Sequence, residues 1–300
     1  MKKEFNFEKF FDDLEVYGQT PEDEFVESDE VAGSKMVGDE ASPITFQSRI
    51  EELGKGVTLE LVRISSGRFL MGSPEGEGEN NEHPQHSVSI PAFWMGIYPV
   101  TQAQWKAVAS LPKIKLDLSP DPSKFKGDNR PVEQITWREA IEFCHRLAKK
   151  TGGGYRLLRE AEWEYACRAG TTTPYHFGET ISTDLANYNG NYIYNAAPKG
   201  KYRKQTSPVG SFNTANSFGL HDMHGNVCEW CIDPWHNNYQ GAPTDGSTWR
   251  KKVRDPLRVL RGGSWALHDV QVRSSSRSSA YTSFKSSDIG FRVATRFWYN

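Results

Sequence analysis

The 300-residue sequence contains few cysteines and no long apolar run, and each shortage excludes a class of protein. No run of about 18 apolar residues occurs, so no membrane-spanning helix is predicted. Residues 1–8 lack the apolar core of a signal peptide, and we therefore expect a cytoplasmic protein. Four cysteines are too few for a disulfide framework in a chain of this length, so we expect reduced thiols at Cys144, Cys167, Cys228 and Cys231.

The charge is distributed unevenly along the chain. Residues 1–42 hold 13 Asp and Glu against 4 Lys, a net charge of −9; because the whole chain carries −2, the other 258 residues carry +7. We predict an acidic N-terminal tail over residues 1–47, with a short amphipathic helical pattern at 3–17, and one domain over 48–300. The tail is either loosely ordered or binds a partner. The basic balance of the domain is too weak to indicate nucleic-acid binding.

The pattern of the domain changes along its length. The 26 Gly and 16 Pro indicate many turns, while 9 Trp, 12 Tyr and 16 Phe can fill a core. Alternating residues predict strands at 57–64, 69–72 and 86–90, and apolar periods predict helices at 101–110, 136–150 and 158–169. Beyond residue 169 only short strands and long polar loops are expected. Loops of that length usually bind a ligand or are held by an ion.

Five segments carry a family resemblance. They are Gly67–Ser73, Tyr98–Thr101, Tyr155–Ala166, Phe218–Trp230, and Arg261–Trp265 closed by Ile289–Val293. Together, over about residues 57–296, they resemble the formylglycine-generating-enzyme (sulfatase-modifying factor) family. The resemblance implies an α+β, C-type-lectin-like fold that is rich in loops and has little regular secondary structure. Two departures occur, at Leu158-Arg159 and at Cys228, and neither removes a functional group.

The oxidase activity of that family is not expected here. The resemblance implies a copper ion held by two thiolates, which soft Cu(I) prefers, and the matching positions are Leu267 and Val272. We therefore predict no copper and no catalytic residues. The related iron-dependent sulfoxide synthases take histidines from an added N-terminal domain, and residues 1–50 contain none. Cys228 and Cys231 form a C-x-x-C, for which core packing is favoured over a zinc site.

Residues 266–288 are serine-rich, without helical or strand period, and lie between two motif segments. This arrangement resembles the variable proteins of diversity-generating retroelements, in which adenine-directed mutagenesis rewrites such a segment. Randomised Asn codons would account for every residue type in it except Gln271 and Lys285. The resemblance implies a surface that binds a protein or other macromolecular ligand. The positions expected to contact it are Ala266, Leu267, His268, Asp269, Val270, Ser276, Ser278, Ser279, Ala280, Tyr281, Phe284, Ser286, Ser287 and Asp288.

A calcium site is implied by the same family resemblance. The matching positions are the side chains of Asp222 and Glu229 and the carbonyls of Gly225 and Val227; a second site would use Asn187 and Tyr188. Carboxylates combined with carbonyls suit a hard cation that takes about six to eight oxygens. The ion would be structural and would hold loops that bury little apolar surface. The alternative is an ordinary buried polar network.

Two other functions stay open at this stage. One is a divergent enzyme, for which His268, Asp269 and Arg273 are the titratable groups near the former copper positions. The other is a scaffold or regulatory protein recruited through its acidic tail. The sequence favours a non-catalytic, calcium-stabilised domain that presents residues 266–288 to a ligand.

Overall fold

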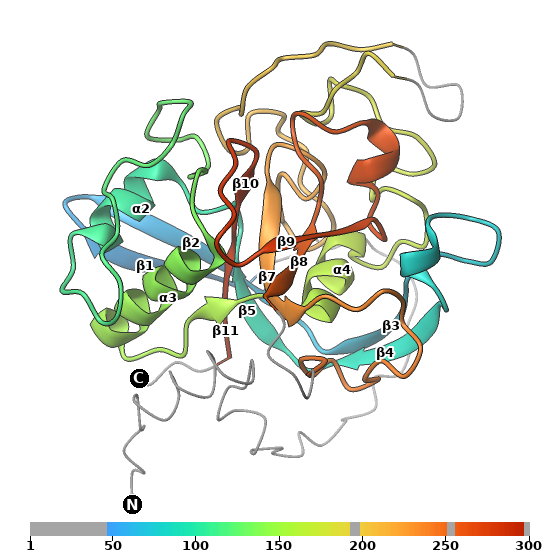
Figure 1. Ribbon diagram of the computed structural model, residues 1–300, viewed down its shortest axis with the longest axis horizontal. Coiled ribbons are helices and arrows are strands. Elements are labelled where there is room, and N and C mark those ends of the chain that lie inside the picture. The colour runs from blue at the N-terminus through green and yellow to red at the C-terminus, as the bar shows by residue number, and fades with distance from the viewer. Residues whose placement is uncertain (1–46, 193–198, 251–255, 297–300) are drawn as a thin grey trace, which may run out of the picture.

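The structure is a computed structural model that describes residues 47–192, 199–250 and 256–296. The expectation for the acidic tail therefore lies outside the described residues, apart from residue 47. Within the described part the chain forms three sheets and three α-helices, joined by long loops (Figure 1). None of these helices is long and apolar enough to cross a membrane.

The largest sheet has five strands in the order β1-β2-β5-β11-β6. Its strands are β1 (Ser48–Gly54), β2 (Val57–Ile64), β5 (Phe93–Gly96), β6 (Arg156–Leu157) and β11 (Val293–Thr295). All four pairings are antiparallel. The last strand of the described chain, β11, lies between β5 and β6. The helices α2 (Gln102–Ala109) and α3 (Trp137–Thr151) pack against each other beside this sheet (Figure 1).

Local sequence explains where these two helices begin and end. Thr101 and Thr136 each accept a hydrogen bond from the backbone three residues on, and Gln104 and Glu139 return a bond to the cap backbone. These capping boxes satisfy amide groups that the first helical turn leaves free. Gly152 ends α3 in a left-handed conformation, with φ of 77°. The expected helices at 101–110 and 136–150 are confirmed.

The second half of the fold is built on a four-stranded sheet in the order β10-β7-β8-β9. It comprises β7 (Cys228–Pro234), β8 (Leu257–Arg261), β9 (Arg277–Tyr281) and β10 (Ile289–Gly290). A separate hairpin joins β3 (Gly67–Met71) to β4 (His86–Ile90), with the short 3-10 helix η2 (Asn80–Glu82) in its loop. Helix α4 (Glu160–Arg168) lies against both the hairpin and strands β7 and β8.

The core is aromatic and divided into two large clusters and one small one. Trp105, Trp163 and Trp230 are almost fully buried, in agreement with the predicted role of the aromatic residues. In Figure 1 the long loops gather above the sheets, together with η3 (Asp269–Val272). Segments from distant parts of the sequence therefore share one irregular face.

Candidate ligand-binding face

The segment before residues 266–288 forms a buried frame. Gly262 and Gly263 have φ of 86° and 66°, a backbone region that favours glycine. A Cβ at Gly263 would lie 2.5 Å from the side chain of Val272, so any larger residue would displace the following turn. Phe291 and Arg292, on the other side of the segment, are fully buried. The two motif segments that enclose residues 266–288 therefore form a buried frame, in which Trp265 is half-buried.

Arg261 connects this frame to the segment itself. Its guanidinium pairs with Glu164 of α4 and donates hydrogen bonds to the carbonyls of Ser274, Ser275 and Ser276. One side chain thus binds the backbone of three consecutive residues. The serines at 274 and 275 are buried for this reason, although their composition suggested a solvent-exposed loop.

Arg273 is a second buried anchor, inside the segment. Its guanidinium forms two hydrogen bonds of 2.7 and 2.9 Å with the carboxylate of Glu82 in η2. The two residues are 191 positions apart in the sequence. Ser73 and Ser275 also contact this pair. Burial by itself raises the pKa of Glu82, but the bonds and charge of Arg273 outweigh it, and the pKa lies below its ordinary value.

Arg277 is a third anchor, at the start of β9. It forms hydrogen bonds of 2.6 and 2.9 Å with the two carboxylate oxygens of Glu160. Its guanidinium also lies 4.7 Å from the ring centre of Trp235 and 4.1 Å from that of Tyr239. Such a bidentate pair between aromatic rings favours arginine over lysine. Seven residues of the segment are buried and six are exposed, so part of it is built into the molecule rather than displayed.

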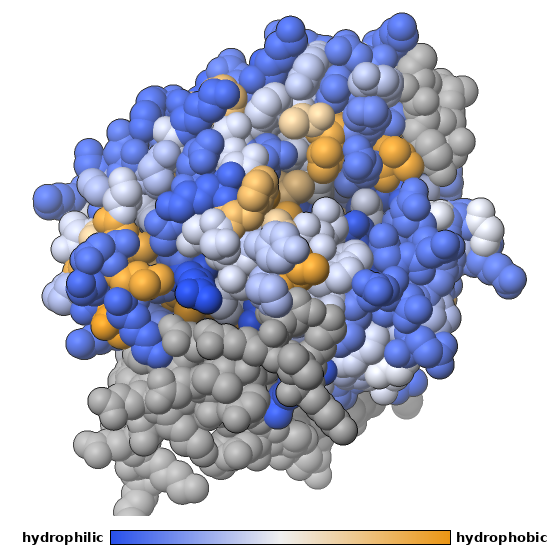
Figure 2. Space-filling model, in the orientation of Figure 1, coloured by the Kyte–Doolittle hydropathy of each residue, from blue (hydrophilic) through white to orange (hydrophobic). Residues whose placement is uncertain are grey.

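The rest of the segment lies at the surface. Tyr281 and Phe284 are 60% and 49% exposed, and Ser278, Ser283 and Lys285 are exposed beside them. Ser276, Ser279 and Ala280 are half-buried, and Ala280 packs on the main core cluster. Figure 2 shows that the surrounding face is mostly hydrophilic, with small separate hydrophobic patches. Large side chains on such a surface are available for contact with a partner.

Several residues expected at the surface are held more tightly than the sequence suggested. Asp269 is only 3% exposed and is not displayed, because the 3-10 turn η3 folds it inward and its backbone accepts a bond from Tyr175. Asp288 accepts hydrogen bonds from Ser264 and Ser286 and so belongs to the frame. The residues at 266–268, 270 and 286–287 are half-buried. The expectation of a segment without regular structure is corrected by η3 and β9.

His268 has an aromatic partner that the sequence did not reveal. Its ring stacks on Tyr192 with a centroid distance of 3.8 Å and an interplanar angle of 7°. Tyr192 comes from a distant loop and is 54% exposed. The surface around residues 266–288 therefore includes scaffold loops as well as the segment itself.

The loop expected to hold calcium is well formed in the structure. Gly225, Val227 and Glu229 are buried and Asp222 is half-buried with φ of 55°. Burial raises the pKa of Asp222 to about 6, and one of its oxygens accepts a bond from the Gly210 amide. Glu229 is already paired: its carboxylate accepts bonds from Arg292 and from Trp163. A cation at this loop would share Glu229 with these two donors.

Asn187 provides the clearest vacant oxygen among the expected ligands. Its Oδ1 is buried and accepts no hydrogen bond from the described residues, while its Nδ2 donates to the carbonyl of Gln205. The backbone of Asn187 forms an isolated β-bridge with Gly225, and its carbonyl accepts a hydrogen bond from the backbone N–H of Asn226. The two expected calcium loops therefore lie side by side. Tyr188 next to it is buried. Buried oxygens of this kind are satisfied by water or by a cation.

The four cysteines are buried and unpaired, as expected for core thiols. Within the described residues, no group of three or more His, Cys, Asp and Glu side chains is arranged to hold a metal ion. Burial raises the pKa of Cys167 to about 12, so its thiol is protonated at neutral pH. Cys228 and Cys231 are buried in the two large core clusters, so the C-x-x-C is part of the core.

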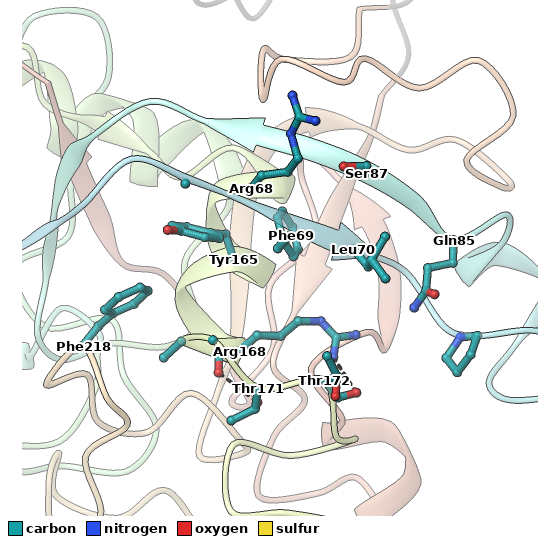
Figure 3. Close-up of a pocket in the computed structure, with 14 residues that line it drawn as sticks. Arg68, Phe69, Leu70, Gln85, Ser87, Tyr165, Arg168, Thr171, Thr172 and Phe218 are labelled. Carbon is teal, nitrogen blue, oxygen red and sulfur yellow. Dashed lines mark hydrogen bonds between the residues drawn. The ribbon is translucent and has the colours of Figure 1, made fainter. Parts of the chain in front are cut away.

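A cavity of about 730 Å³ opens between the β3–β4 hairpin and the end of α4 (Figure 3). Phe69, Tyr165 and Phe218 form its aromatic wall, with centroid distances of 5.4 and 5.6 Å from Tyr165 to the other two rings. Arg168 on its floor is bound by Glu164 and by loop carbonyls. The lining contains no His, Cys, Asp, Glu or Lys; its polar side chains are those of Arg68, Gln85, Ser87, Tyr165, Arg168, Thr171 and Thr172.

Comparison with known families agrees with this architecture. Residues 47–297 match the family described as the sulfatase-modifying factor enzyme 1-like domain. The chain belongs to this family. The C-type-lectin-like fold of the formylglycine-generating-enzyme type, expected from five short motifs, is thereby confirmed.

Three members or structural neighbours of the sulfatase-modifying factor family are informative. Inactive C-alpha-formylglycine-generating enzyme 2 of Bos taurus is 29% identical over 81% of this chain and 90% of its own length. The structure of PvdO from Pseudomonas aeruginosa superimposes with a TM-score of 0.70 and 34% identity, covering 83% of this chain and 98% of PvdO. Treponema denticola variable protein 1 superimposes with a TM-score of 0.66 and 25% identity, covering 84% and 100%. The last likeness supports the resemblance to variable proteins.

Proposed function

We propose that this protein is a non-catalytic ligand-binding member of the sulfatase-modifying factor family. Its ligand would be a protein or other macromolecule bound by the exposed part of residues 266–288. The observation that carries this proposal is the division of that segment: buried arginines anchor its backbone, while Tyr281, Phe284 and Ser278 face solvent. A rigid base with adaptable side chains is what a display surface requires.

The family's copper chemistry has no ligands at the expected positions. Leu267 is half-buried against the core and Val272 is fully buried, and neither side chain has an atom that binds copper. The similarity to an inactive bovine relative and to a bacterial variable protein supports binding rather than oxidation.

Calcium is the second part of the proposal. Asp222, Glu229 and the carbonyls of Gly225 and Val227 would hold one ion, and Asn187 with the carbonyl of Tyr188 would belong to a second site in the adjoining loop. The vacant, buried Oδ1 of Asn187 supports this assignment. When bound, the ion would link loops that otherwise make few apolar contacts, and its role would be structural.

A library selection tests the binding role. Positions 278, 281, 283 and 284 are randomised on a display platform, and the library is selected against a panel of folded proteins. A matched library randomises four exposed positions of the β1–β2 hairpin, namely 48, 50, 52 and 55. We expect specific binders only from the first library. Equal recovery of binders from both libraries would contradict the proposal.

The absence of oxidase activity is tested separately. The purified protein is incubated with a cysteine-containing sulfatase peptide, copper and oxygen, and the peptide mass is measured. We expect no formylglycine above a blank that contains copper without protein. Protein-dependent turnover would refute the non-catalytic part of the proposal.

A further inference from the structure

A row of aromatic rings from three separate loops lies beside the segment. Trp265 is its centre: Phe125 approaches with a centroid distance of 5.5 Å and Tyr202 with 6.2 Å. Lys124 lies 5.3 Å from the centre of the Phe125 ring, and Lys204 lies 5.8 Å from that of Tyr202. We call these five residues the aromatic strip; it consists of three rings with an ammonium group at each end.

Hydrogen bonds hold two residues of the strip, Phe125 and Trp265, in place. The Phe125 amide donates to Glu133 at 2.8 Å and its carbonyl accepts a bond of 2.7 Å from Gln102. The Trp265 amide donates to the carbonyl of Asn226, and its indole N–H donates to the carbonyl of Ser287. The three rings are nevertheless only half-buried. Pre-ordered, partly exposed rings lose little conformational entropy when they bind a partner.

The charge of the strip is positive. Lys124 and Lys204 are exposed, and within the described residues neither forms a salt bridge. Glu133, which accepts a bond from the Phe125 amide, is fully buried, and Asp288 accepts bonds from two serines. In the loop that carries Phe125, Asp121 and Asp128 are exposed, and Asp121 pairs with Lys126. The two lysines at the ends of the strip can therefore pair with an anionic partner.

We propose that the aromatic strip is a fixed subsite for an acidic peptide segment that carries aromatic side chains. The inference rests on the proposed binding role of this face and names the chemistry of the partner. Trp265 and Phe125 stand at 87° to each other, which makes a corner that can receive an aromatic ring at its edge and face. Lys124 and Lys204 would pair with carboxylates on either side.

The strip would complement the variable surface. Under the proposed binding role, Tyr281 and Phe284 would change identity without loss of the fold, whereas Phe125 and Tyr202 lie outside residues 266–288. The strip would therefore select a class of partner by its charge, and the exposed segment would select among members of that class.

The test uses labelled poly(Glu,Tyr), an acidic copolymer with aromatic side chains, in fluorescence anisotropy with the full chain. Polyglutamate and heparin serve as comparison probes. We expect poly(Glu,Tyr) to bind at low salt and to bind at least tenfold more weakly to Lys124→Glu/Lys204→Glu and to Tyr202→Ala. Matched controls are Lys55→Glu/Lys149→Glu, at the β1–β2 turn and the end of α3, and Ile50→Ala, which truncates an exposed apolar side chain on β1; both should bind as the parent does.

Thermal melting confirms that each variant is folded. No binding of poly(Glu,Tyr), equal or tighter binding of heparin or polyglutamate, or an equal loss in the control lysine variant would overturn the assignment. Failure of the broader binding role would be seen elsewhere, in the library selection, because that experiment does not vary the strip.

Discussion

At the scale of single residues, three arginines decide how residues 266–288 are held. Arg261, Arg273 and Arg277 are nearly fully buried, and each pairs with a glutamate from another element. Removing one partner of a buried ion pair leaves the other charge without compensation, which typically costs about 3–5 kcal/mol. Exposed substitutions usually change stability by only about 0.5 kcal/mol. Stability should therefore differ sharply between neighbouring positions of one segment.

The Arg277 anchor gives the first prediction. Arg277→Ala should lower the free energy of unfolding by about 3–5 kcal/mol, because Glu160 would stay buried without its partner. Arg277→Lys should also destabilise, since lysine cannot form the two-oxygen contact between Trp235 and Tyr239. Ser278→Ala is the neighbouring control and should be nearly neutral. Urea unfolding of the three variants measures the difference; equal stabilities would contradict the anchor.

Glu133 predicts a pH dependence. Burial raises its pKa to about 7 despite backbone hydrogen bonds from Phe125 and Lys124 that lower it. Between its ordinary pKa of 4.5 and about 7, the folded protein thus keeps a proton that the unfolded chain has released. Its contribution to stability therefore falls as the pH rises through this window.

Glu133→Gln removes that titration while keeping an acceptor for the Phe125 amide. The difference in the free energy of unfolding, variant minus parent, should be about 1–3 kcal/mol larger at pH 8 than at pH 4.5. Denaturant unfolding at both pH values measures this change. A stability difference between variant and parent that does not depend on pH would show that Glu133 is already ionised in the folded state.

At the scale of elements, regular secondary structure follows the sequence closely, and the loops do not. The expected strand at 86–90 and the capping box at Thr136 are found as predicted, because alternation and capping are local signals. The pairing of Arg273 with Glu82 joins residues 191 positions apart, and nothing in the neighbouring sequence of either residue indicates it. The strip around Trp265 likewise combines three loops whose contact only the fold creates.

The adjoining loops at 187–188 and 222–229 give the calcium prediction. Chelation should lower the melting temperature of the parent protein, because an ion bound only by the folded state stabilises it. Asp222→Ala and Asn187→Ala should each lose that sensitivity to chelator. A melting temperature that chelator does not change in the parent, after calcium has been added, would rule out a structural calcium site.

At the scale of the whole molecule, five short motifs sufficed to predict the fold, because they supply the special backbone conformations and the large buried side chains. Gly263, Phe291 and Arg292 are examples that the structure places in the frame. The candidate ligand-binding face could be located from the sequence but not divided into anchored and exposed parts. Serine is compatible with either environment, so composition alone could not separate Ser275, which is buried, from Ser278, which is exposed.

The central claim is that residues 266–288 combine anchored positions with displayed positions. A saturation-mutagenesis library over the segment, scored by resistance to protease, tests it most directly. The account predicts that substitutions are tolerated at 278, 281 and 283–285 and are excluded at 272–275 and 277. Uniform tolerance across the segment, or intolerance at Tyr281 and Phe284 equal to that at Arg273 and Arg277, would contradict it.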